Sequence, residues 1–172
     1  MKKEEMKHPA CKENIPMKRV LLFLLCALFL ASCARKPAAD LSAASSPADA
    51  EPQVILVYYG DENAEKLLSS QVQVDEINAE TILSHLCSAH VLPEGIAVNK
   101  LEKDGTRLMI DFNPSFGDFL CAQGTSGEYI AIGSMVNTFL SAYNADSLVF
   151  TVDGEILESG HVIYDFPLEF ME

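Results

Sequence analysis

An apolar run near the amino terminus limits how much of this 172-residue chain can form a folded domain. Residues 20–30 are eleven consecutive apolar residues, and the basic pair Lys18-Arg19 precedes them. A helix that crosses a bilayer needs roughly 20 apolar residues, so this run is too short to be a membrane anchor. A basic flank, a short apolar run and a small-residue site are typical of a secretory signal peptide. We therefore assign residues 1–32 to a signal peptide.

The beginning of that signal peptide has two interpretations. Residues 1–16 are polar and mixed in charge. They either lengthen the charged flank or lie upstream of a true start at Met17, which is the interpretation we prefer. Both give the same mature protein.

The end of the apolar run, Leu30-Ala31-Ser32-Cys33, resembles the lipobox that lipoprotein-processing enzymes recognise. The resemblance implies that the signal peptidase recognises Leu30, Ala31 and Ser32, and that Cys33 carries a diacylglyceryl group with acyl chains such as palmitate. Two acyl chains hold a protein stably on a membrane, whereas one binds only marginally. We expect a mature protein that begins at Cys33, lies outside the cytoplasm and is anchored to the cell membrane by its lipid.

The mature chain divides into a tether and one domain. Residues 33–51 contain the lipidated cysteine followed mainly by Ala, Ser, Pro and Asp, a composition typical of a flexible linker. Residues 52–172 have the length of a single domain. From Cys33 onward there are 6 basic and 22 acidic residues, a net charge of −16. This charge repels nucleic acid, so DNA or RNA binding is not expected.

Apolar patterns predict the elements in the first half of the domain. Residues 54–59 are apolar on both faces, which favours an interior strand covered on both sides. Residues 67–74 are a weaker, edge-strand pattern. Residues 75–90 predict a helix that buries one face; the residues of that face are Ile82, Leu83, Leu86 and Cys87.

A hairpin and a second helix follow. Residues 96–102 and 107–113 predict a strand pair joined at Asp104-Gly105, with Leu108, Ile110 and Phe112 on one core face. Thr125-Ser126-Gly127-Glu128 has the spacing of a capping box at the start of a helix. Its expected buried stripe is Ile132, Met135, Val136, Phe139, Leu140 and Tyr143.

The chain then predicts strands at 147–152 and 162–170, separated by a turn at Asp153-Gly154. The whole order is β-α-β-β-α-β-β. It predicts an α/β (α+β) sandwich with two helices packed on one mixed sheet.

This order and several short motifs resemble the GerMN domain family, named from spore-germination lipoproteins. The matching stretches are Tyr58-Tyr59-Gly60-Asp61, Leu92-Pro93-Glu94-Gly95, Ile110-Asp111-Phe112-Asn113, Thr138-Phe139-Leu140 and Val152-Asp153-Gly154. The motif positions carried over are Tyr58, Tyr59, Leu92, Pro93, Gly95, Asp111, Thr138, Asp153 and Gly154. The family's usual Gly-Pro pair after the first helix is missing, because Val91 runs directly into Leu92.

The resemblance implies a function in the envelope of sporulating bacteria. The family is thought to bind ligands or partner proteins, related folds assemble into rings, and no catalytic residues or cofactors are recognised for it. We therefore expect a non-enzymatic module, without a cofactor, that binds an envelope protein or a wall-associated ligand in sporulation or germination. Homo-oligomerisation through sheet edges is an alternative. A solute-binding lipoprotein or a wall-modifying enzyme are further alternatives, although one small domain does not suit two-lobed closure around a solute.

Several side chains are candidates for chemical sites. Cys87 with His85 or His90 is the minimum for a thiol–imidazole pair, but no third group orients it. Together with His161, these three residues are of the types that bind metals. Their spacing does not match a known metal motif, so no metal is expected. The cluster at 61–65 resembles a calcium loop in composition only, and a solvated turn is the preferred interpretation.

Three further features have two interpretations each. Asp111 and Asp153 end strands that should adjoin, and they are either paired carboxylates or ordinary strand-end residues. Cys87 and Cys121 are either free thiols, which we prefer, or a disulfide. Residues 116–120 form an apolar loop that either enters the core, which we prefer, or offers a partner an exposed patch.

Overall fold

The computed structural model describes residues 52–172, so the predictions for the signal peptide, for Cys33 and for the tether lie outside the described residues. The elements are β1 (Gln53–Gly60), β2 (Leu67–Val74), α1 (Ala79–Ser88), β3 (Val98–Asp104), β4 (Arg107–Phe112), α2 (Pro114–Cys121), α3 (Thr125–Tyr143) and β5 (Ser147–Val152). Within this part of the chain, no helix has the length and apolar character needed to cross a bilayer. The predicted α+β class is confirmed.

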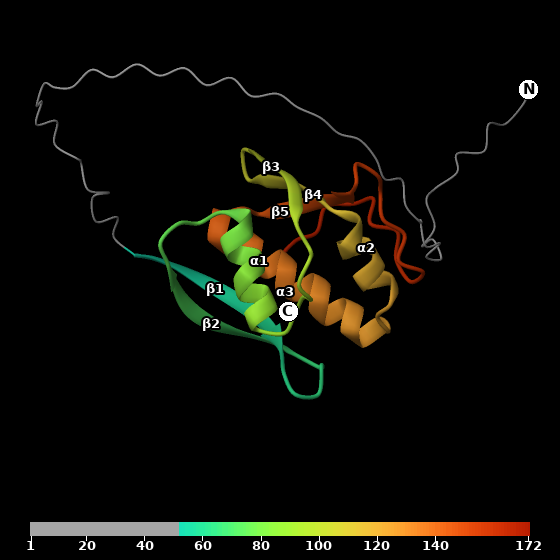
Figure 1. Ribbon diagram of the computed structural model, residues 1–172, viewed down its shortest axis with the longest axis horizontal. Coiled ribbons are helices and arrows are strands. Elements are labelled where there is room, and N and C mark those ends of the chain that lie inside the picture. The colour runs from blue at the N-terminus through green and yellow to red at the C-terminus, as the bar shows by residue number, and fades with distance from the viewer. Residues whose placement is uncertain (1–51) are drawn as a thin grey trace, which may run out of the picture. The chain divides into compact units, whose positions relative to one another are not determined.

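The described strands form two sheets rather than the single mixed sheet expected. β1 and β2 are an antiparallel pair, while β3, β4 and β5 form a mixed sheet in which β4 and β5 are parallel. Figure 1 shows α3 passing between the pair and the mixed sheet, and α3 contacts both β1 and β5. Residues 131–140 of α3 are all buried. Because consecutive residues on all sides of this helix are buried, it needs cover on more than one side.

Close contact between α3 and the β1–β2 pair depends on two glycines. A Cβ atom at Gly60 would lie 2.7 Å from Ile130, and one at Gly133 would lie 2.7 Å from Leu67. The helix is also tied to the strand by Thr138, whose hydroxyl accepts a hydrogen bond from the Tyr58 N–H at 3.0 Å. Two of the family-motif positions, Tyr58 and Thr138, therefore meet at this helix–sheet contact.

Two predictions about the first half of the domain need correction, and one is confirmed. β1 is not covered on both faces, because Ile55 and Val57 are buried while Val54 is 54% exposed. β2 has the predicted bounds. α1 begins at Ala79 rather than near residue 75, because the Asn78 side chain caps it by accepting from the Thr81 N–H at 2.8 Å.

The predicted capping box at the start of α3 is wrong. Gly124 is the N-cap residue and makes no side-chain cap bond. Glu128 points into the protein, where it is 3% exposed and accepts a hydrogen bond from the Tyr164 hydroxyl at 2.6 Å. Five residues of the predicted stripe are buried as expected: Ile132, Met135, Val136, Phe139 and Leu140. The sixth, Tyr143, is half-buried.

Residues 116–120 belong to a helix, α2, and not to a loop. Phe116 and Leu120 are fully buried, so the interpretation that this segment enters the core is confirmed. Pro114 begins the helix, where its fixed φ is favourable and its missing N–H costs nothing.

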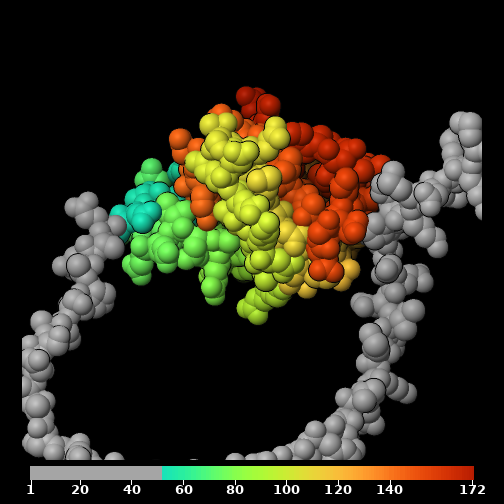
Figure 2. All heavy atoms as spheres, turned by 90° about the horizontal axis from the view of Figure 1, so that it is seen from above, coloured from blue at the N-terminus to red at the C-terminus, as the bar shows by residue number. Residues whose placement is uncertain are grey.

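The C-terminal segment, residues 153–172, contains isolated bridges instead of the predicted strand at 162–170. Leu168 pairs with Leu148 of β5, and Ile163 pairs with Glu158. The Asn137 side chain on α3 donates to the Met171 carbonyl at 2.7 Å and accepts from the Met171 N–H at 2.8 Å. These bonds to a helix side chain take the place of a regular strand ladder. In Figure 2 the red atoms of this segment lie on the surface of the domain.

Candidate functional site

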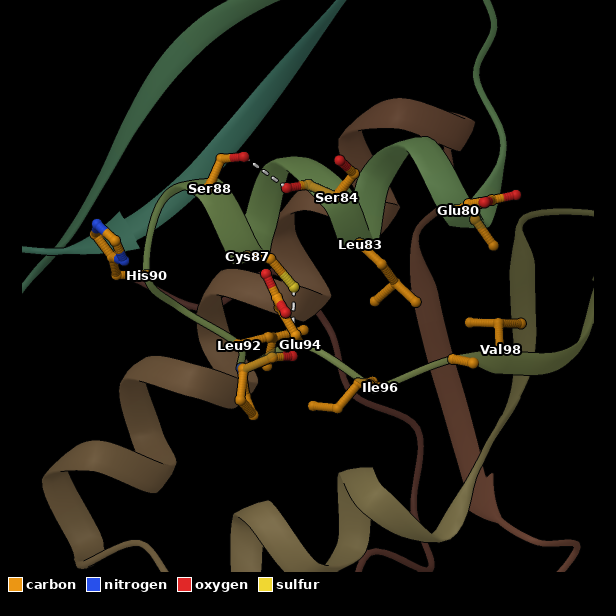
Figure 3. Close-up of a pocket in the computed structure, with 14 residues that line it drawn as sticks. Glu80, Leu83, Ser84, Cys87, Ser88, His90, Leu92, Glu94, Ile96 and Val98 are labelled. Carbon is orange, nitrogen blue, oxygen red and sulfur yellow. Dashed lines mark hydrogen bonds between the residues drawn. The ribbon is translucent and has the colours of Figure 1, made fainter.

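A groove beside α1 is lined in part by the family motif Leu92-Pro93-Glu94-Gly95. One wall is the outer face of α1 and the other is the segment 92–98, and together they enclose about 750 Å³. Figure 3 shows Leu83 from the helix and Ile96 from the segment directed into the space between them. Leu83, Leu92 and Ile96 are buried and form an apolar floor. The exposed carboxylates Glu80 and Glu94 also line the groove, so its rim is acidic.

The end of α1 determines where the second wall runs. His90 takes a left-handed conformation (φ 58°), and the Val91 N–H then bonds the Leu86 carbonyl at 2.9 Å. This reversal turns the chain back along the helix and buries Leu92. Gly95 has φ 91°, a conformation that favours glycine, and its carbonyl accepts from the Asn113 side chain at 2.8 Å.

The Cys87 thiol lies inside this groove. It is a free cysteine and donates a weak hydrogen bond to the Pro93 carbonyl at 3.4 Å. Burial raises the pKa of the Cys87 thiol, and the negative charge of Glu94 raises it further. A raised thiol pKa is the opposite of what an activated nucleophile needs. Figure 3 shows the His90 ring directed away from the sulfur, so Cys87 and His90 do not form a thiol–imidazole pair.

We predict that Cys87 reacts slowly with iodoacetamide at neutral pH. Since the thiolate is the reactive form, alkylation at neutral pH should be several-fold slower than for an unperturbed cysteine, and the rate should rise with pH until it levels off above the raised pKa. Glu94→Gln should increase the rate, because it removes one of the two causes of the raised pKa. Glu62→Gln, at an exposed carboxylate that does not line the groove, should leave the rate unchanged. Mass spectrometry of the Cys87 peptide measures the rate, and equal rates in all three proteins would contradict the assignment.

The two cysteines considered as a disulfide do not bridge each other. Cys87 is free, whereas Cys121 is not, so the free-thiol prediction is confirmed for Cys87 only. The Cys121 sulfur also lies 3.8 Å from the Glu158 carbonyl oxygen. Among residues 52–172, no group of three or more His, Cys, Asp and Glu side chains could hold a metal ion.

Asp111 is a structural residue rather than half of a carboxylate pair. One carboxylate oxygen accepts from the Thr151 hydroxyl at 2.6 Å and from the Gly154 N–H at 2.7 Å, and the other accepts from Asn99 at 3.0 Å. These bonds hold the pKa of Asp111 below its usual value, with Thr151 the largest cause. Asp153 does not join it but occupies a left-handed turn position (φ 52°). From β4, the motif residue Asp111 therefore holds the end of β5 and the turn at Asp153-Gly154 that follows it.

We predict that Asp111→Ala costs about 1 kcal/mol of unfolding free energy at pH 7, because three donors lose their acceptor at a partly solvated site. The folded pKa of Asp111 lies below the unfolded value near 3.8, so its contribution is complete above that pH and is lost as the pH falls through the folded pKa. Urea unfolding measures this effect: the difference in unfolding free energy between wild type and variant should be smaller at pH 3 than at pH 7. Asp165→Ala, at an exposed carboxylate, is the control.

The Asp61 turn also uses its carboxylate for the backbone. One Asp61 oxygen accepts from the N–H groups of Glu65 at 2.8 Å and Lys66 at 3.3 Å. These bonds lower the pKa of Asp61, and the Glu65 N–H is the largest cause. The solvated-turn interpretation is confirmed.

Sequence reasoning missed a second cavity, of about 530 Å³, between the N-terminal half of α3 and the segment 161–171. Glu128, Tyr164 and His161 line it. The missed signal was the position of Glu128 four residues before Ile132 and seven before Met135, which places it on the buried stripe of the helix.

The described residues form an α+β domain with a groove beside α1. The sequence profile of the Germane family, described as sporulation and spore germination, matches residues 56–158. The chain belongs to this family, and the GerMN resemblance is confirmed. No curated protein matches in sequence.

Solved structures with a similar fold come from two bacteria. A protein from Clostridium perfringens described as a candidate lipoprotein shares 15% identity, with a TM-score of 0.46, over 69% of this chain and 87% of its own. The first GerMN domain of the sporulation protein GerM from Bacillus subtilis shares 17%, with a TM-score of 0.46, over 60% of this chain and 84% of its own. The tandem GerMN domains of GerM share 14%, with a TM-score of 0.45, and this chain covers 45% of their length.

Proposed function

We propose that this protein is a lipoprotein of the cell envelope whose domain binds a partner protein or a wall-associated ligand, without catalysis, during sporulation or germination. The observation that carries the proposal is the groove beside α1, because the motif residues Leu92, Pro93 and Gly95 form its wall. Its volume is within the range of about 300–1,000 Å³ typical of binding sites.

The groove's chemistry indicates what it binds. An apolar floor suits one or two apolar side chains, and the carboxylates of Glu80 and Glu94 suit basic groups beside them. The described residues contain 19 acidic and 4 basic side chains, which strengthens the attraction for a basic partner. A segment that alternates apolar and basic residues is the occupant we propose.

The mechanism is recruitment. A diacylglyceryl group on Cys33 would fix the protein on the membrane. The acidic domain is repelled by anionic headgroups, so the groove would stay free for a partner beyond the lipid surface. The raised pKa of the Cys87 thiol supports a binding role for the groove over a nucleophilic one.

Complementation of a gene deletion tests this proposal. In the organism that encodes the protein, the deletion strain receives wild type, the double variant Glu80→Lys/Glu94→Lys or the control Glu62→Lys/Glu65→Lys. All four glutamates are exposed, so both doubles change the charge equally without disturbing the core. We expect wild type and control to restore spore formation or germination and the groove variant to fall at least tenfold short. Full rescue by the groove variant would exclude the groove as the binding site. A deletion without any phenotype would exclude a function in sporulation or germination.

Self-assembly through sheet edges is the second candidate. Among the described strands, β1 pairs with β2 alone. The Thr138 hydroxyl of α3 takes the Tyr58 N–H of β1, so the outer edge of β2 is the one that we propose for strand addition. The edge strand β3 is a weaker candidate, because the exposed Lys100, Glu102 and Lys103 discourage strand addition. Light scattering of the full chain with Cys33→Ser, measured across concentrations, separates the candidates: recruitment predicts a constant monomer mass, and self-assembly predicts a mass that rises.

A further inference from the structure

We propose that the cavity between α3 and the segment 161–171 binds a small primary amine with an aromatic body, and that Glu128 receives its ammonium group. This site is separate from the groove beside α1 and does not depend on the function proposed for it. Most of its outer wall lies beyond residues 56–158, the part that matches the family.

The argument begins with the unsatisfied carboxylate. Glu128 is 3% exposed and lines the cavity. Its Oε1 atom accepts from the Tyr164 hydroxyl at 2.6 Å, but its buried Oε2 atom has no hydrogen-bond partner among the described residues. Leaving a buried carboxylate oxygen unpaired is costly, and a charged donor in the cavity would remove that cost.

Tyr164 fixes how the carboxylate is presented. Burial raises the pKa of the Tyr164 hydroxyl, and the hydrogen bond to Glu128 and the charge of Glu128 raise it further. Tyr164 therefore remains a proton donor at neutral pH and holds Oε1. One oxygen is left for a ligand, which suits the single-point contact of an ammonium better than the two-point contact of a guanidinium.

The remaining walls indicate the body of the ligand. Ile132, Leu168 and Met171 supply apolar surface, and Tyr129 and Phe166 supply aromatic surface. Aromatic faces attract cations and stack on aromatic rings. A carboxylate on the ligand would meet Glu128 and Glu169 in the same cavity, so an amine without an acid group is expected to bind better than an amino acid.

The cavity wall is held in place without a ligand. The Tyr129 hydroxyl donates to the Glu172 carbonyl, and Asn137 makes two hydrogen bonds with the backbone of Met171. The aromatic ring of Phe170 also contacts that of Tyr58, with centroids 5.4 Å apart. A wall fixed in this way loses little conformational freedom on binding.

Isothermal titration calorimetry with 2-phenylethylamine tests the proposal. The full chain with Cys33→Ser is used, so that the probe does not partition into detergent. We expect saturable 1:1 binding, at least tenfold weaker binding of the neutral isostere 2-phenylethanol, and weaker binding of the zwitterion phenylalanine. In Glu128→Gln the preference for the amine should disappear, while Glu62→Gln, at an exposed carboxylate that lines neither the cavity nor the groove, should keep it.

Four results would overturn the proposal. Absence of saturable binding would indicate a cavity filled by water alone. Equal binding of amine and alcohol would indicate apolar recognition only, and amine binding that survives Glu128→Gln would indicate attraction to the acidic surface. Tighter binding of N-acetyl-lysine methylamide would indicate a lysine of a partner protein. If Glu128→Gln does not fold, Phe166→Ala provides a second test of the proposal. The Phe166 side chain is 46% exposed, and its removal should weaken amine binding several-fold.

Discussion

Replacing Phe112 by alanine is expected to lower the free energy of unfolding by about 3–5 kcal/mol, the largest stability effect in this domain. Phe112 is fully buried at the end of β4 and stacks on Phe116 of α2, with ring centroids 4.2 Å apart. Its edges meet Phe139 of α3 at 6.5 Å and Phe150 of β5 at 6.1 Å. The ring therefore connects the mixed sheet to two helices, and the cavity left by alanine would be lined from every side.

Urea unfolding followed by circular dichroism measures this loss. A domain of this size has about 5–15 kcal/mol of stability in total, so the variant should be partly unfolded under mild conditions. Phe170→Ala is the matched control, because that ring is 53% exposed and should contribute less than about 1 kcal/mol. Similar losses for the two variants would show that Phe112 is not at the centre of the core.

The second large effect is expected from Cys33→Ser. If a diacylglyceryl group on Cys33 is the membrane anchor, the variant should lose incorporation of labelled palmitate and move almost completely from the membrane fraction to the soluble fraction. Electrostatic attachment should not compensate, because the mature chain has a net charge of −16 and anionic lipids repel it.

Cys87→Ser is the control for that experiment. It makes the same chemical change at a free thiol inside the domain, and it should leave both labelling and membrane association intact. Retention of the Cys33 variant in the membrane fraction would contradict the lipid anchor and would require another means of attachment.

Local sequence patterns correctly predicted the elements that pack against the core through a single face. Leu108, Ile110 and Phe112 alternate along β4 because one face of that strand meets the core, and all three are buried. The Asp104-Gly105 turn was also evident, since Gly105 adopts φ 59° between β3 and β4. Such signals depend on chemistry within a few residues, and the sequence shows it directly.

The errors arose where residues distant in sequence decide the outcome. Thr125 and Glu128 have capping-box spacing, yet Tyr164, 36 residues further along, bonds the Glu128 carboxylate inside the protein. The division into two sheets follows from the burial of α3 on several sides, which its single predicted stripe did not indicate. In the candidate site, the motif Leu92-Pro93-Glu94-Gly95 was visible, but its position against α1 depends on the reversal at His90.

The central claim is that the groove beside α1 contacts another molecule in the envelope, and photo-crosslinking in cells tests it most directly. A benzophenone amino acid is placed at Ser84, an exposed position that lines the groove, and for comparison at Glu62, an exposed position that does not line it. We predict one discrete adduct from Ser84, absent from Glu62 and lost in Glu80→Lys/Glu94→Lys. No adduct from Ser84, the same adducts from both positions, or an adduct of twice the protein's own mass would contradict the claim.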